Sequence, residues 1–205
     1  MNQLEYLKHQ WNQLLADYHL EKALTDVYFE ELVAAYTETH RYYHTLSHLE
    51  ALFQSLTEID CDDQSILWSV WYHDIIYKPG RSDNELKSAE LARLRMQALE
   101  LDSRMVNDVY DFIIATKHHQ TQDPKCQLFL DADMAILGAE LTAYKTYVEQ
   151  VAMEFKRIPG FLYKRGRKKF LKTVLSSEKV FKSPVFYSRY EQQARANMQW
   201  ELDGL

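Results

Sequence analysis

The chain has 205 residues, 46% of them hydrophobic and 26% charged, which favours one soluble globular domain over two. Its net charge of −6 argues against a nucleic-acid partner, and its two cysteines lie too far apart in sequence for a CxxC motif, which excludes a disulfide framework and fits a reducing cytoplasm. No apolar run approaches the ~18 residues of a membrane span, so we expect a cytoplasmic protein without a membrane partner.

The elements expected along the chain are helices. Glycine and proline number only five and four, well below the usual share of about 12%, so turn-rich sheet folds are disfavoured. Hydrophobic periodicity and capping residues predict an all-α bundle with helices over residues 2–18, 21–39, 44 or 45 to 56, 62 or 63 to 77, 82 or 83 to 99, 102 or 103 to 118, 139–156, 161–176 and 188–201. Residues 127–137 fit a short strand or a buried helix, and the helical context favours helix.

We expect one domain over residues 1–205, with N-terminal helices over 1–40, a central core over 41–137 and C-terminal helices over 138–205. The helix predicted to end near Tyr77 is apolar on nearly every side, so it should run through the middle of the protein.

Two histidines, His44 and His48, follow an aromatic pair in the stretch RYYHTLSHL. Residues four apart lie on one face of a helix, so both imidazoles are expected to point the same way. They are either core residues with a polar tip or ligands of a shared group.

Next along the chain, His73 and Asp74 lie within the apolar stretch WYHDIIY. An ionisable pair is costly to bury unless it is paired or bound to a metal. The plainer alternative is a histidine that bonds to the backbone, with Asp74 as its local partner.

Asp131 and Asp133 are a second pair of polar residues in an apolar run, FLDADMAIL. A helix cap explains one of these aspartates but not both. Between the two pairs, His118 and His119 end a predicted helix, where the helix dipole favours a cationic imidazole without any further role.

The ordered set His44, His73-Asp74 and Asp133 resembles the H…HD…D pattern of the HD superfamily of metal-dependent phosphohydrolases. The similarity is greatest to a subgroup of small bacterial proteins predicted to be such phosphohydrolases. It spans residues 41–197 through RYYHTLSHL, WYHDIIY, NELKSA, ATKHH and FLDADMAILG, and more weakly through GRKKFL and EQQARANM. The resemblance implies a single helical HD domain with its metal site among the central helices.

The resemblance also implies roles for individual residues. His44, His73, Asp74 and Asp133 would bind one divalent metal ion, with Mn, Fe, Zn, Co, Ni and Mg not distinguished and a second metal left open. Asp133 is preferred to Asp131 as the ligand, which leaves Asp131 to orient a ligand or a water molecule. The remaining assignments are catalytic roles for Asp74 and for Glu85 or Asp131, and phosphate contacts for His48, for His119 rather than His118, and for Arg41 and Lys117.

The expected activity is hydrolysis of a small phosphorylated molecule, such as a nucleotide, by a metal-activated water. Nucleotide specificity does not carry over, because several nucleotide-acting HD enzymes have an acidic residue three or four positions after the HD aspartate, where this chain has Tyr77 and Lys78. A two-iron oxygenase centre and a ligand-binding or regulatory protein without catalysis remain alternatives. The sequence also leaves a homodimer open.

Overall fold

The computed structural model describes all residues from 1 to 205, and they form an all-α protein without strands. This confirms the predicted fold class. Ten α-helices and one 3₁₀ helix follow each other along the chain: α1 (Gln3–Leu14), α2 (Lys22–Tyr36), α3 (Leu46–Thr57), α4 (Gln64–Tyr72), α5 (Asn84–Ala98), α6 (Ser103–Ala115), α7 (Pro124–Asp133), η1 (Ala135–Gly138), α8 (Leu141–Glu154), α9 (Gly160–Leu175) and α10 (Pro184–Gly204). None of these helices is both long and apolar enough to cross a lipid bilayer.

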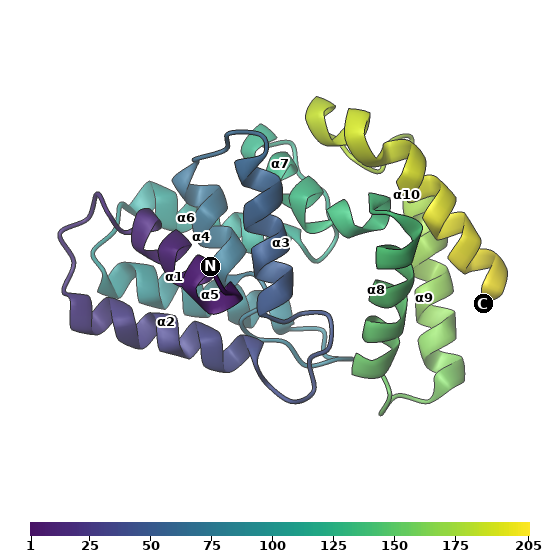
Figure 1. Ribbon diagram of the computed structural model, residues 1–205, viewed down its shortest axis with the longest axis horizontal. Helices are drawn as coiled ribbons and strands as arrows, with labels where there is room; N and C mark the ends of the chain where they lie inside the picture. Colours follow the sequence, from purple (N-terminus) through teal and green to yellow (C-terminus); the bar gives the residue numbers. More distant parts are fainter.

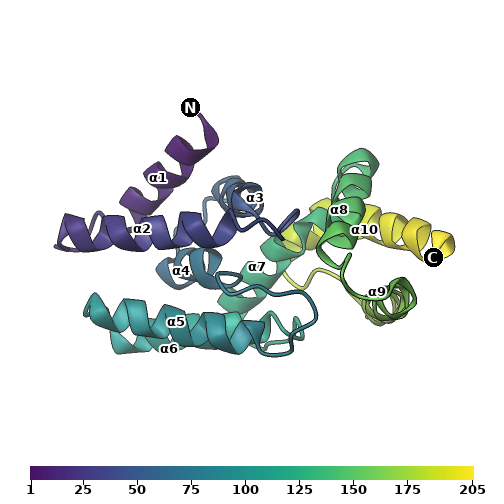
Figure 2. The same ribbon diagram turned by 90° about the horizontal axis from the view of Figure 1, so that it is seen from below.

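The helices form two groups that meet at α7 (Figures 1 and 2). At one end of the molecule, α4 lies among α1, α2, α3, α5 and α6. At the other end, α8, α9 and α10 pack together. Helix α7 contacts α3, α4 and α6 in the first group, and through η1 the chain passes on to α8 and α10.

Helix α4 occupies the centre of the first group, as its apolar sequence predicts. Seven of its nine residues are buried, and Trp68 and Trp71 lie edge-on to Trp11 of α1 with ring centroids 5.5 Å away in each case. Trp11 itself is fully buried and donates a hydrogen bond to the carbonyl of Thr25. This aromatic cluster fixes the end of α4, from which the HD pair emerges.

Helix α4 ends at Tyr72, five residues earlier than the sequence predicts. The reason is a tertiary contact from Arg41, whose buried guanidinium donates to the carbonyls of Asp74 and Ile75 at 2.7 and 2.9 Å. Carbonyls that leave a helix need other partners, and Arg41 supplies them. His73 and Asp74 therefore lie at a helix end, not within a helix.

The other boundaries differ less from those predicted. Of residues 127–137, those up to Asp133 belong to α7, which begins earlier, at Pro124, where the side chain of Asp123 caps it, and residues 135–137 belong to η1. Helix α10 begins at Pro184, four residues before the predicted start, because proline suits the first helical position.

Glycine is required at Gly138, where η1 crosses α10. A Cβ atom at this position would lie 2.5 Å from the Cβ of Tyr190, closer than two carbon atoms can approach. Asn197 of α10 also donates to the carbonyls of Leu137 and Ala139 on either side of this glycine. These contacts fix η1, and with it the end of α7, against the C-terminal helices.

Candidate metal centre

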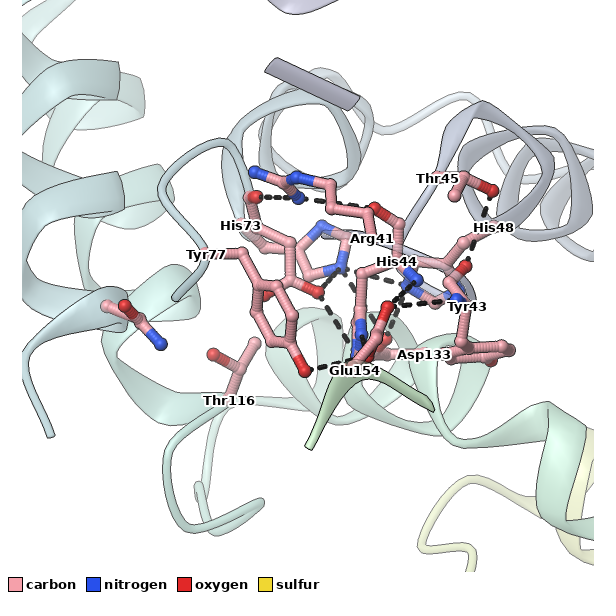
Figure 3. A network of polar contacts seen from close by, with 12 residues as sticks. Arg41, Tyr43, His44, Thr45, His48, His73, Tyr77, Thr116, Asp133 and Glu154 are labelled. Atoms are coloured by element: carbon pink, nitrogen blue, oxygen red, sulfur yellow. Dashed lines mark hydrogen bonds and ion pairs between the residues drawn. The ribbon is translucent and has the colours of Figure 1, made fainter. Parts of the chain in front are cut away.

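Side chains from three separate segments approach one another where the helix groups meet, and Figure 3 shows three of them, His48, His73 and Asp133. His48 comes from the first turn of α3, His73 and Asp74 from the end of α4, and Asp133 from the last turn of α7. His48 and His73 are almost fully buried, whereas the Asp74 and Asp133 side chains keep 20% and 15% of their surface exposed. The group therefore has a buried imidazole side and a carboxylate side that solvent can reach.

The ligand-type atoms of this group are close together. His48 Nε2 lies 3.1 Å from His73 Nε2 and 3.2 Å from Asp133 Oδ1, and His73 Nε2 lies 3.3 Å from Asp74 Oδ2. One such atom from each of His48, His73 and Asp74 falls within 4.8 Å of the others. A His48–His73–Asp74 group of this kind could hold a metal ion, since divalent ions are bound by mixed imidazole and carboxylate sets.

The ring of His73 is oriented by the backbone. Its Nδ1 lies 3.0 Å from the carbonyl of Val70, which can only accept, so Nδ1 carries the proton and the lone pair of the neutral ring is at Nε2. A hydrogen bond that fixes the tautomer in this way is typical of metal-binding histidines. The sequence leaves two alternatives for His73, a hydrogen bond to the backbone or a place in a metal site. The structure makes the two compatible, because Nδ1 bonds to the backbone and Nε2 faces the group.

The charges of the group favour a cation at its centre. Burial opposes the charged imidazolium of His73, but the carboxylates of Asp74 and Asp133 outweigh burial and raise the pKa of His73 to about 9. Burial also opposes ionisation of Asp74 and Asp133, yet the neighbouring histidines hold the pKa of each carboxyl below its usual range. For His48, burial prevails and lowers the pKa of the imidazole. The two carboxylates that stabilise the extra proton on His73 Nε2 would equally stabilise a divalent cation in the place of that proton.

His44 lies beside this group but outside it. It precedes α3, which begins at Leu46, so His44 and His48 do not share a helix face as their spacing predicts. The Nε2 atom of His44 is 3.8 Å from Asp74 Oδ2, farther than the contacts within the group. Its other ring nitrogen, Nδ1, donates to Glu154 Oε2 at 2.7 Å.

Glu154, the last residue of α8, is a site residue that sequence reasoning missed. One of its oxygens accepts from the backbone N–H groups of residues 42, 43 and 44 at 2.9, 2.9 and 3.0 Å. The other accepts from His44 and from the hydroxyl of Tyr77, at 2.7 and 2.8 Å. Burial opposes the charge of Glu154, but these donors, His44 first, lower its pKa to about 2.

No motif in the sequence points to Glu154, because it lies 110 residues from His44 in a helix with one other glutamate, Glu149. The sequence marks Tyr77 only as a position where several nucleotide-acting HD enzymes have an acidic side chain. In the structure its ring packs 4.2 Å from that of His44, between centroids. Glu154 and Tyr77 together fix the orientation of His44.

His119 approaches the group from the end of α6. Its Nε2 lies 3.5 Å from Asp133 Oδ2, the oxygen opposite the one near His48, whereas His118 is exposed. The backbone of His119 has a φ of 50°, in the left-handed region that non-glycine residues enter rarely. Such a conformation stores strain, and it occurs here where it directs an imidazole toward a candidate ligand.

The structure brings Asp131 and Arg41 into contacts other than those predicted. Both carboxylate oxygens of Asp131 accept from the segment before α10, from the N–H groups of Lys182 and Ser183 and from the Ser183 hydroxyl. Arg41, expected at a phosphate, is buried and bonds to backbone carbonyls around the HD pair, with His44 among them. Both residues hold the backbone in place.

Glu85, in the first turn of α5, lies near Lys117, which follows the end of α6. Lys117 Nζ donates to the carbonyl of Ser82 and lies 3.9 Å from Glu85 Oε2. That glutamate oxygen is buried and has no hydrogen-bond partner. Neither side chain forms an ion pair with His48, His73, Asp74 or Asp133.

No protein-family model, curated protein or solved structure matches the chain significantly. The fold and the site together define an all-α protein with a buried His–Asp group that could hold a metal ion.

Proposed function

We propose that the protein is a metal-dependent hydrolase of phosphate esters. The observation that carries this proposal is the His48–His73–Asp74 group, with Asp133 Oδ1 3.2 Å from His48 Nε2 and 3.6 Å from His73 Nε2. In this proposal these four residues bind the ion, and His48 takes the place that the resemblance to the HD superfamily gives to His44. The order of the chain remains H…HD…D with either histidine in the first position.

A divalent ion in this site would lower the pKa of a coordinated water toward ~7 and screen the charge of a phosphate group. Water oxygen then forms a bond to phosphorus, the P–O bond to the organic group breaks, and the leaving oxygen needs a proton. The residue suited to supply it is His44. Its Nδ1 donates to Glu154, which leaves Nε2 free to donate a proton. Burial lowers the pKa of His44, but the charges of Asp74 and Glu154 outweigh burial and raise it.

The other polar residues have supporting roles in this proposal. His119 holds Oδ2 of Asp133, so that Oδ1 stays directed toward His48 and His73. Asp131 does not suit the role of a base, because Lys182 and Ser183 occupy both of its oxygens. Glu85, with one unpaired buried oxygen, remains a candidate only for a more distant contact.

The decisive test is hydrolysis by metal-loaded protein of a panel of phosphomonoesters, phosphodiesters and nucleotides. We expect turnover of at least one class, and a loss of about 100-fold or more in Asp74→Ala, a residue with a carboxylate in the group. Asp83→Ala is the matched control, because Asp83 is paired with Arg81 in an exposed loop away from the site. Absence of turnover by the wild type, or equal rates in Asp74→Ala and Asp83→Ala, would overturn the proposal.

A two-metal centre is the second candidate, and one feature of the geometry favours it. Asp74 lies between the group and His44, and Asp133 lies between the group and His119, so each carboxylate has a further imidazole within 3.8 and 3.5 Å. Elemental analysis separates the candidates. One ion per chain fits the mononuclear hydrolase, whereas two irons per chain with oxygen-dependent turnover would identify an oxygenase centre instead.

A further inference from the structure

A cavity of about 340 Å³ opens beside the candidate metal centre, and His48 and Asp133 form part of its wall. It lies between α3 on one side and η1, α8 and α10 on the other, where the two groups of helices meet. Small side chains such as Ala51 and Ala135 leave the space open. Any molecule bound there would be in contact with two of the proposed ligand residues.

The cavity carries no positive charge of its own. Its fifteen lining residues include neither lysine nor arginine, and Asp133 is its one carboxylate. The cations Lys78, Lys156 and Arg157 surround a different cavity, which borders Glu154 and none of the four ligand residues. Lys156 reaches this cavity only through the hydroxyl of Tyr42, to which its ammonium donates at 2.6 Å. An anionic group that left water for the cavity beside Asp133 would meet no cation in its wall, and burying an unpaired charge is strongly unfavourable.

Hydrogen-bonding groups are nevertheless present. Three of the lining residues, Gln150, Tyr43 and Tyr190, have side chains that can form hydrogen bonds. An amide offers both donors and an acceptor, and a phenol offers both as well. Aromatic and aliphatic walls with a few such polar groups are typical of sites for uncharged organic molecules.

We propose that this cavity binds the organic part of the phosphate ester, and that this part is a compact, uncharged ring with hydrogen-bonding atoms. The inference rests on the proposed hydrolysis only for the position of the phosphate at the metal centre. A substrate with its organic group in the cavity presents its phosphorus to the side of the group formed by His48 and Asp133. A second phosphate or carboxylate on the organic group weakens binding.

The test uses phosphonates, which bind as esters do but are not hydrolysed. Phenylphosphonate and methylphosphonate are titrated into metal-loaded protein by calorimetry, for the wild type and for Ala51→Phe. Ala51 lies on the exposed surface of α3 and lines the cavity, so phenylalanine fills the space without entering the core. The matched control is Gln54→Phe, an exposed residue of the same helix that does not line the cavity.

We expect Ala51→Phe to weaken phenylphosphonate binding at least 10-fold and to leave methylphosphonate binding unchanged, while Gln54→Phe changes neither. In the wild type, 4-carboxyphenylphosphonate is expected to bind at least 10-fold more weakly than phenylphosphonate. Equal phenylphosphonate affinity in the two variants, absence of phosphonate binding, or tighter binding of the carboxylated compound would overturn the inference. If the selective loss occurs in a protein that hydrolyses no ester, the cavity assignment stands and the proposed hydrolysis fails.

Discussion

Two buried polar clusters of the protein are built differently: one lies within the C-terminal group of helices, and the other, the candidate metal centre, lies where the two groups meet. In the C-terminal group, Arg167 of α9 donates to both oxygens of Glu201 at 2.7 and 2.9 Å. Tyr144 donates to the same carboxylate and Tyr147 accepts from the guanidinium, so the charges of this cluster are balanced by its own members. In the candidate metal centre two imidazole nitrogens lie 3.1 Å apart and face two carboxylates.

The difference shows how a structural cluster is told from a functional one. A bidentate arginine–carboxylate pair satisfies its own hydrogen bonds, so it needs nothing from outside the protein. In the candidate metal centre, imidazole and carboxylate side chains that are oriented by other hydrogen bonds direct their lone pairs toward a common point. A ligand bound at that point explains such an arrangement. Four changes test this distinction, in decreasing order of expected effect.

Removing one member of the self-balanced cluster should have the largest effect on stability. Glu201→Ala leaves the Arg167 guanidinium buried without its partner, and breaking a buried pair in this way costs about 3–5 kcal/mol. Metal content should not change. Urea denaturation with elemental analysis measures both, and Glu58→Ala, which breaks the exposed pair with Arg189, should cost less than about 1 kcal/mol. If Glu201→Ala cost as little as Glu58→Ala, the view that the Arg167–Glu201 pair stabilises the fold would be wrong.

Glu154 should make stability depend on pH below the ordinary range of a glutamate. Its pKa of about 2 in the folded protein lies below the 4.5 of an unperturbed glutamate, so its stabilisation is fully present above pH 4.5 and is lost as the pH falls toward 2. The total is on the order of 3 kcal/mol. His44 adds no slope in this window, because its pKa is raised above 6.5 and it is protonated in both states.

The measurement is urea denaturation of metal-free protein at a series of pH values from 5 down to 3. Glu154→Gln should flatten the curve in this window, and Glu58→Gln, an exposed control, should not. If wild type and Glu154→Gln lose stability in parallel, the hydrogen bonds to residues 42, 43 and 44 do not depend on the charge of Glu154.

Replacement of the two histidines of RYYHTLSHL, His44 and His48, should have different effects on metal affinity. We expect His48→Ala to weaken metal binding by about 100-fold, because His48 is in contact with His73 and Asp133. His44→Ala should keep the metal but lose turnover, since His44 is proposed as the proton donor. Competition with a chelator measures the affinity, with exposed His9→Ala as control. The reverse outcome, metal loss in His44→Ala alone, would return His44 to the ligand set.

The sequence predicted the helices well and the detailed site less well, for physical reasons. Helical periodicity depends on local spacing, so all ten α-helices were expected, including the central position of α4. The end of α4 depends on Arg41, a residue more than thirty positions away, and no local pattern encodes such a contact. The predicted helix begins at residue 44 or 45 and places His44 and His48 on one face, whereas α3 begins at Leu46 and leaves His44 outside it.

The candidate ligands illustrate the same limit. His73, Asp74 and Asp133 were singled out because ionisable residues in apolar runs need partners, and each lies in the converging group. Asp131 shares that signal but serves another purpose. Two residues apart on a helix point in different directions, so Asp133 faces His48 while Asp131 faces the backbone before α10. Glu154 gave no signal, since its partners lie on a distant segment.

The smallest expected effect concerns the backbone of His119. A left-handed φ of 50° costs a non-glycine residue about 1 kcal/mol, and glycine adopts it freely. His119→Gly should therefore raise the free energy of unfolding of the metal-free protein by less than about 1 kcal/mol. It should also weaken metal binding about 10-fold, because Asp133 Oδ2 loses the imidazole beside it.

Asp60 and Glu100 provide matched controls, since both have a positive φ, at 53° and 55°, and neither contacts the candidate metal centre. Asp60→Gly and Glu100→Gly should stabilise the protein by a similar amount and leave metal affinity unchanged. If all three variants behave alike, the strain at His119 is an ordinary feature of helix ends, as at Asp60 and Glu100. A loss of metal affinity confined to His119→Gly would mean that the chain tolerates strain at this position because the strain directs an imidazole to Asp133.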